Sequence, residues 1–185
     1  NTASCAFVAF ASILMTGFSS SLPVLQWEAT AGPNAQHITA LVVDDENPQT
    51  VYAGLSTGSV FKSSDKGQTW AMFSAIGEGK TIYRLVQHPE FKGRVYASSE
   101  TGLFVSTNRG KDWIGVQMDK DGTRAVRALC IDPFKTNLVY AGVQGRGIYR
   151  STNMGEEWTR CDLGIDAKRL ANAAVNDITV EPSRP

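Results

Sequence analysis

The stretch that decides the fold is Ser63-Ser64-Asp65-Lys66-Gly67-Gln68-Thr69-Trp70, because two further copies of its pattern follow it. These copies run from Ser106 to Trp113 and from Ser151 to Trp158. Each copy reads Ser, Ser or Thr, Asp or Asn, any residue, Gly, two polar residues and Trp. Asp and Asn side chains bond to their own backbone and Gly permits a positive φ, so the pattern predicts a tight hairpin turn.

The same period governs the rest of the chain. The four tryptophans at 27, 70, 113 and 158 lie 43, 43 and 45 residues apart, and each interval holds short apolar runs rich in β-branched residues. Four short strands per period predict one blade of a β-propeller. We therefore expect an all-β propeller of four-stranded antiparallel blades. Three complete blades are expected at about 38–76, 82–118 and 126–163, with partial strands at 24–30 and 176–181.

The three octapeptides resemble the Asp-box, or BNR repeat, of β-propeller proteins such as sialidases, xyloglucanases, sortilin-type receptors and photosystem II assembly factors. The resemblance runs from Trp27 to Pro182, with Asn108 and Asn153 at two positions where the family has Asp. Asn can make the same local turn bonds, so the expected fold is unchanged. The structural Asp-box residues that the resemblance implies are Ser63, Asp65, Gly67, Trp70, Ser106, Asn108, Gly110, Trp113, Ser151, Asn153, Gly155 and Trp158.

Because known propellers have at least four blades, the chain is expected to be a fragment of a larger propeller. The N-terminal segment does not fit the repeat. Residues 3–18 carry no charge, and their length suits the apolar part of a signal peptide better than a membrane span. Residues 1–21 are thus expected to be a signal-peptide remnant and 22–185 the propeller, although an apolar strand or helix of the fold is the alternative. We therefore expect an exported protein that is secreted, periplasmic or lumenal. After removal of the signal peptide it should have no stable membrane span.

Composition excludes several function classes. The 185 residues have a formal net charge of zero, with 18 acidic and 18 basic side chains, so we expect no nucleic-acid partner. Two His and three Cys without metal-ligand spacing predict no metal site and no cofactor. Cys130 and Cys161 fall in the first and last predicted strands of one blade, roughly 14 Å apart, which predicts two separate thiols.

The resemblance places ligand sites on the face opposite the Asp-box turns. Four residues are candidates there: Arg84, Arg127, Glu100 and Arg146. Arg84 and Arg127 could form an anion site, or they could be ordinary paired or solvated side chains at strand ends. Catalytic residues are unknown. Glu100 is the sole candidate acid, with a surface turn residue as the competing interpretation, since a glycosidase generally needs two carboxylates or a Tyr nucleophile.

The chain lacks the F-R-I-P segment that a sialidase-like enzyme should show and the T-D-x-G-G segment of a xyloglucanase-like one. The function predicted is therefore a non-catalytic, exported binding or assembly module whose partner is a protein or a polysaccharide. The main alternative is a fragment of a secreted glycoside hydrolase with its catalytic acids in missing blades. A carbohydrate-binding propeller without turnover is the third possibility.

Overall fold

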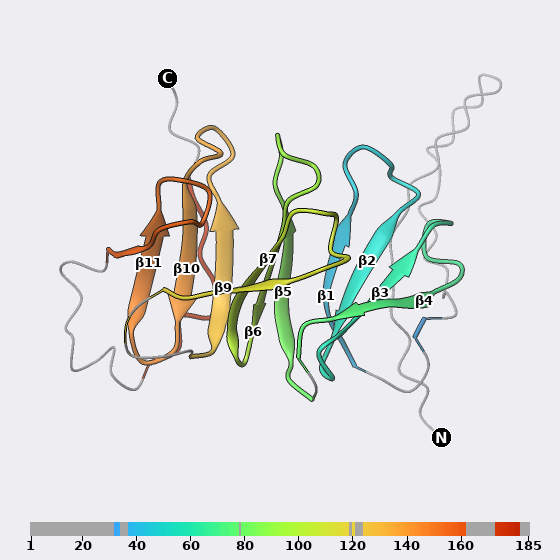
Figure 1. The fold of residues 1–185 in the computed structure, drawn as a ribbon, viewed down its shortest axis with the longest axis horizontal. Coiled ribbons are helices and arrows are strands. Elements are labelled where there is room, and N and C mark those ends of the chain that lie inside the picture. The colour runs from blue at the N-terminus through green and yellow to red at the C-terminus, as the bar shows by residue number, and fades with distance from the viewer. Residues whose placement is uncertain are drawn as a thin grey trace, which may run out of the picture.

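The computed structural model describes residues 32–33, 37–77, 79–118, 120, 124–161 and 173–181. In these residues the chain forms twelve strands in three four-stranded antiparallel sheets, with no helix (Figure 1). The first sheet holds β1 (Ile38–Val43), β2 (Val51–Leu55), β3 (Ser59–Ser63) and β4 (Ala71–Ala75). The second holds β5 (Ile82–Gln87), β6 (Val95–Ser99), β7 (Gly102–Ser106) and β8 (Ile114–Val116). The third holds β9 (Val126–Ile131), β10 (Val139–Val143), β11 (Gly147–Ser151) and β12 (Thr159–Arg160).

The three sheets are successive blades of a β-propeller, so the predicted fold class is confirmed. Within each blade, neighbouring strands in the sequence are neighbours in the sheet. The first strands of the blades, β1, β5 and β9, contact one another in series and lie side by side in Figure 1. We call the sheets blade 1, blade 2 and blade 3 in chain order.

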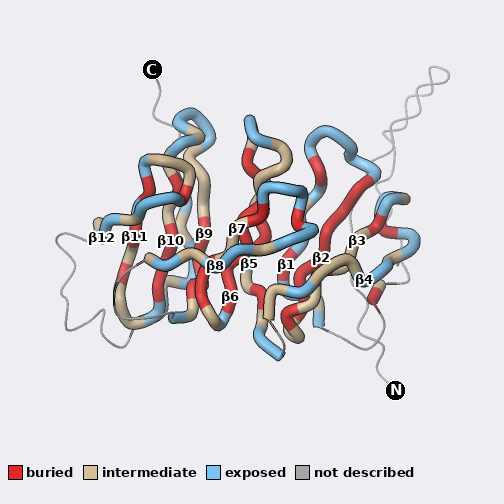
Figure 2. Tube along the Cα trace, viewed as in Figure 1, coloured by how far each residue is buried: buried red, intermediate tan, exposed pale blue. Residues whose placement is uncertain are grey.

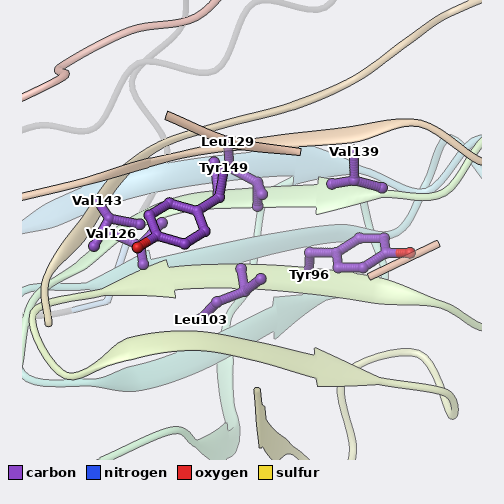
Figure 3. Close-up of a cluster of buried hydrophobic side chains, with 8 residues drawn as sticks. Tyr96, Leu103, Val126, Leu129, Val139, Val143 and Tyr149 are labelled. Atoms are coloured by element: carbon purple, nitrogen blue, oxygen red, sulfur yellow. The ribbon is translucent and has the colours of Figure 1, made fainter. Parts of the chain in front are cut away.

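The hydrophobic core lies between the blades, because each sheet buries its faces against its neighbours. The second strand of each blade carries the deepest burial, as the buried segments of Figure 2 show. Figure 3 shows one cluster, in which Tyr96 and Leu103 of blade 2 lie opposite Leu129 and Val139 of blade 3. A second cluster joins blades 1 and 2. Apolar contact between blades is therefore what holds the array together.

Each Asp-box turn is organised around a buried serine oxygen. In the first box, Ser63 Oγ donates to Asp65 Oδ1 at 2.7 Å and accepts the Gly67 amide at 2.7 Å. Gly67 has a φ of 86°, and Lys66 before it has a φ of 61°, a conformation that L residues rarely adopt. The second and third boxes repeat these bonds with Ser106 and Ser151. The shared sequence pattern thus encodes one shared turn.

The box tryptophans are half-buried rather than fully enclosed. Trp70 and Trp158 donate their indole N–H to the carbonyl oxygens of Gly67 and Gly155, at 2.9 and 3.0 Å. Trp113 instead donates to Ser74 Oγ of blade 1 at 3.1 Å. Trp70 and Trp158 therefore close their own turns, whereas Trp113 links blade 2 to blade 1. Only part of each ring is buried in the core.

The strand predicted at 176–181 is wrong, since residues 173–181 form no strand. A strand needs a hydrogen-bonded neighbour, and the described part of the chain holds no second strand of a fourth blade. The segment still packs against blade 3, because a Cβ on Gly142 would lie 2.7 Å from Val175 Cβ. The signal peptide predicted at 1–21 and the strand predicted at 24–30 lie outside the described residues.

Candidate functional site

The loops predicted to form a ligand face lie at one end of the sheets. Because the strands are antiparallel, the Asp-box turns share an end with the turns that join the first and second strands of each blade. Backbone bonds link the two sets: Lys66 donates to Gln49 at 2.8 Å and Arg109 donates to Gly93 at 2.8 Å. We call this the box end. The opposite end, which we call the loop end, carries the loops between second and third strands and the segments between blades.

Four side chains from blades 2 and 3 meet at the loop end, and we call them the Tyr83 cluster: Tyr83, Glu100, Arg127 and Gln144. The Arg127 guanidinium carbon lies 4.7 Å from the centre of the Tyr83 ring. Arg127 Nε donates to Gln144 Oε1 at 3.3 Å, and the Tyr83 hydroxyl bonds to the Glu100 carboxylate. Two predicted candidates, Glu100 and Arg127, are therefore joined through a tyrosine.

The electrostatics of the cluster keep the tyrosine neutral. Burial raises the pKa of the Tyr83 phenol, Arg127 opposes this, and the negative charge and hydrogen bond of Glu100 raise the pKa further. At neutral pH Tyr83 therefore keeps its proton, and its hydroxyl donates a hydrogen bond to the Glu100 carboxylate. A tyrosine nucleophile is activated by a lowered pKa or by an adjacent base, and the pKa of Tyr83 is raised. The cluster is suited to hold polar groups and a cation at a surface.

Arg84 is not part of the Tyr83 cluster that contains Arg127. Its guanidinium lies 3.3 Å from the carboxylate of Asp177, with 44% of the Arg84 side chain and 72% of the Asp177 side chain exposed. An exposed pair of this kind contributes about 0–1 kcal/mol. It joins blade 2 to the segment that follows blade 3, and it balances the positive charge of Arg84. The predicted anion site is thus divided between two arginines with different partners.

The fourth candidate, Arg146, lies half-buried in the loop between β10 and β11, also at the loop end. Three partners of the candidates were missed in the sequence: Tyr83, Gln144 and Asp177. One signal could have found the tyrosine. Aligning the first strands of the blades places Thr39, Tyr83 and Arg127 at one repeat position.

The described residues contain no group of three or more His, Cys, Asp and Glu side chains that could hold a metal ion. Cys130 lies on β9 and Cys161 follows β12, and no disulfide joins these two residues. Within the same part of the chain, no helix is long and apolar enough to cross a membrane.

Comparison with known proteins identifies the family. The family model described as sortilin, neurotensin receptor 3 matches residues 58–159, which is more than half of the chain. The chain belongs to the Sortilin-Vps10 family. This Sortilin-Vps10 chain is 36% identical over 70 residues to vacuolar protein sorting/targeting protein 10 of Mycosarcoma maydis, covering 37% of this chain and 5% of that protein. It is 26% identical over 99 residues to a xyloglucanase of Hypocrea jecorina, covering 53% of this chain and 12% of that protein.

Solved structures share the propeller fold with this Sortilin-Vps10 chain. An ancestral GH74 enzyme has a TM-score of 0.64 and 25% identity, covering 76% of this chain and 20% of that one. YCF48 from Cyanidioschyzon merolae has a TM-score of 0.54 and 16% identity, covering 69% of this chain and 37% of that one. The chain therefore spans a small part of the relatives that it matches.

Proposed function

We propose that this Sortilin-Vps10 chain is a non-catalytic, exported propeller module that binds a protein partner at its loop end. The observation that carries the proposal is the Tyr83 cluster, a set of polar side chains held between two blades. Arg127 presents a cation stacked on an aromatic ring, and Glu100 presents an exposed carboxylate. Arg and Tyr are enriched at the centres of protein interfaces, where a stacked guanidinium loses little entropy on binding.

The chemistry of the cluster supports binding rather than turnover. A retaining or inverting glycosidase uses two carboxyl groups on either side of the bond it cleaves. Here Glu100 accepts the Tyr83 hydroxyl, while Asp177 is engaged by Arg84.

The relatives support a protein partner in an extracytoplasmic place. Several are vacuolar protein sorting/targeting proteins, and sorting acts on other proteins. A propeller of this fold, YCF48, is bound to a D1 peptide in one solved structure, although its 17% identity shows only a common fold. We extend these properties to this chain as part of the proposal, with Arg84, Glu100, Arg127 and Arg146 as the binding face.

One observation favours a second function, a piece of a secreted glycoside hydrolase. The xyloglucanase of Hypocrea jecorina is 26% identical over 99 residues, and the ancestral GH74 enzyme reaches 25% identity. On this alternative the present blades are scaffold, and the catalytic acids belong to blades outside this chain.

Binding of purified partner protein tests the proposal. The chain is immobilised, extracytoplasmic proteins of its source organism are passed over it, and the captured protein is purified for affinity measurement. Arg127→Ala and Glu100→Gln should each weaken that affinity at least tenfold, the loss expected for a central interface residue. Lys66→Ala at the box end is the matched control, an exposed cation at the other end of the blades, and it should leave the affinity unchanged.

Two outcomes contradict the proposal. Equal affinities for the Arg127 and Glu100 variants and the wild type would move the partner away from the loop end. Release of reducing sugar from polysaccharides by the full-length protein, lost on mutation of an acid pair, would establish the hydrolase instead.

A further inference from the structure

His88 occupies a turn position at which the other two blades have an aspartate. It follows β5 directly, as Asp44 follows β1 and Asp132 follows β9. The histidine is completely buried, with 0% of its surface exposed. A buried imidazole therefore stands at a position where the repeat otherwise has a carboxylate.

The three side chains accept the same backbone amides. His88 Nδ1 accepts the N–H groups of Glu90 and Phe91, at 3.2 and 3.0 Å. In the third blade, Asp132 Oδ1 accepts the amides two and three residues later, both at 2.9 Å. In the first blade, Asp44 Oδ1 accepts the corresponding amides at 3.0 and 3.3 Å. The imidazole therefore replaces a carboxylate as the acceptor that closes the turn.

The second ring nitrogen reaches the next blade. His88 Nε2 lies 3.0 Å from the carbonyl oxygen of Thr136, in the turn between β9 and β10. A carbonyl oxygen only accepts, so Nε2 carries the proton, and Nδ1, which accepts two N–H groups, carries none. The geometry requires a neutral ring with its single proton on Nε2. Only in that state does His88 close its own turn and hold blade 3.

A second proton has no place in this arrangement. Protonation puts an N–H on Nδ1, where it meets the Glu90 and Phe91 amides, and it leaves a full charge on a completely buried side chain. Burial lowers the pKa of His88, the Thr136 hydrogen bond and Glu90 raise it, and Arg94 and Lys92 lower it. The Phe91 ring packs edge-on against the imidazole with centres 5.1 Å apart, so it is displaced when the turn opens.

We propose that His88 is an acid-sensitive latch between blades 2 and 3, and that its protonation opens the turn 88–94 and frees the Thr136 carbonyl. The latch is specific to this interface. Between blades 1 and 2 the same position is Asp44, whose carboxyl group lies 3.4 Å from the Arg109 guanidinium, so this contact has no imidazole to take up a proton. Acid thus loosens one of the two blade contacts at the box end and leaves the other closed.

The size and sign of the effect follow from proton linkage. The closed latch excludes the proton, while the open turn exposes a histidine with the ordinary pKa of about 6.5. The latch is fully closed above that pH, and its opening constant rises about tenfold for each pH unit below it, down to the depressed pKa of the closed state.

Amide hydrogen exchange measures this opening directly. The Glu90 and Phe91 amides are followed from pH 7.5 to pH 5.5, with the intrinsic exchange rate divided out at each pH. In the wild type their protection should fall about tenfold. His88→Asp restores the residue that the other blades use, so the protection of these amides should stay flat over this range. His37→Gln is the matched control, because His37 is the other histidine and is exposed, and it should follow the wild type.

Equal pH dependence of the wild type and His88→Asp overturns the proposal. A second measurement needs no variant and holds if His88→Asp fails to fold. In an NMR titration of the wild-type chain, the His88 imidazole should titrate below the ordinary histidine pKa of about 6.5, and a pKa at or above that value overturns the latch.

Discussion

The serine of the middle Asp-box provides a sharp test of how these turns are held. Ser106 is 1% exposed, and its Oγ donates to Asn108 Oδ1 at 2.9 Å. The same oxygen accepts the Asn108 amide at 3.2 Å and the buried Gly110 amide at 2.8 Å. One hydroxyl therefore satisfies three polar groups, and Ser106→Ala removes all three bonds while changing the side chain by a single atom.

The expected cost follows from which groups are left without a partner. An unsatisfied buried amide costs about 1–3 kcal/mol, and each of the two bonds to Asn108, which is exposed, contributes about 0.5 kcal/mol. Ser106→Ala should therefore lower the free energy of unfolding by about 2–4 kcal/mol. With a urea m-value of about 2 kcal/mol/M, the unfolding midpoint falls by about 1–2 M.

Urea denaturation followed by tryptophan fluorescence measures this shift. Thr107→Ala changes the exposed neighbour in the same turn and should stay within about 0.5 kcal/mol of the wild type. A loss below about 0.5 kcal/mol for Ser106→Ala would refute the argument that the serine oxygen organises the turn.

Three further predictions concern other parts of the blades. The Asp65 carboxyl should titrate by NMR at a pKa of about 2, because the Thr69 side chain, the Thr69 amide and Ser63 donate hydrogen bonds to its ionised form. The stability that these bonds add is present at neutral pH and is lost as the pH falls through about 2. An ordinary aspartate pKa would exclude those bonds. Gly142→Val places a Cβ 2.7 Å from the Val175 Cβ and should destabilise the chain by about 1–3 kcal/mol in urea, with no loss if residues 173–181 pack elsewhere. Trp158→Ala should cost about 3 kcal/mol and Trp70→Ala less, because both make the same indole bond but only Trp158 packs against a buried cluster; equal losses would assign the stability to the indole bond.

Most of the fold could be predicted from local features of the sequence. The octapeptides specify their turns through contacts within eight residues, such as those of Ser63 with Asp65 and Gly67, and such contacts can be read without knowing the fold. Twelve strands of the described residues follow from the same repeat, and the resemblance then identified the propeller. The strand predicted at 176–181 failed because its formation depends on a partner strand, which a local pattern does not report.

Only part of the candidate site could be predicted from the sequence. Arg127 and Glu100 were found because they are charged residues in loop-end positions. Tyr83 was missed because a tyrosine in an apolar strand gives no sign of whether its hydroxyl meets a core or a carboxylate. The role of His88 could not be predicted either, because its hydrogen bond to Thr136, 48 residues away, depends on how the blades pack.

The sequence by itself determined the blades, since alternation, turn chemistry and period are local properties repeated along the chain. Only the tertiary structure decided what lies between them. Leu41, Leu85 and Leu129 occupy one repeat position, yet Leu41 is 41% exposed and the other two are 6% exposed. Leu85 packs against blade 1 and Leu129 packs against blade 2. Among the described residues, no preceding blade covers Leu41. Burial depends on neighbours in space, which identical local patterns cannot specify.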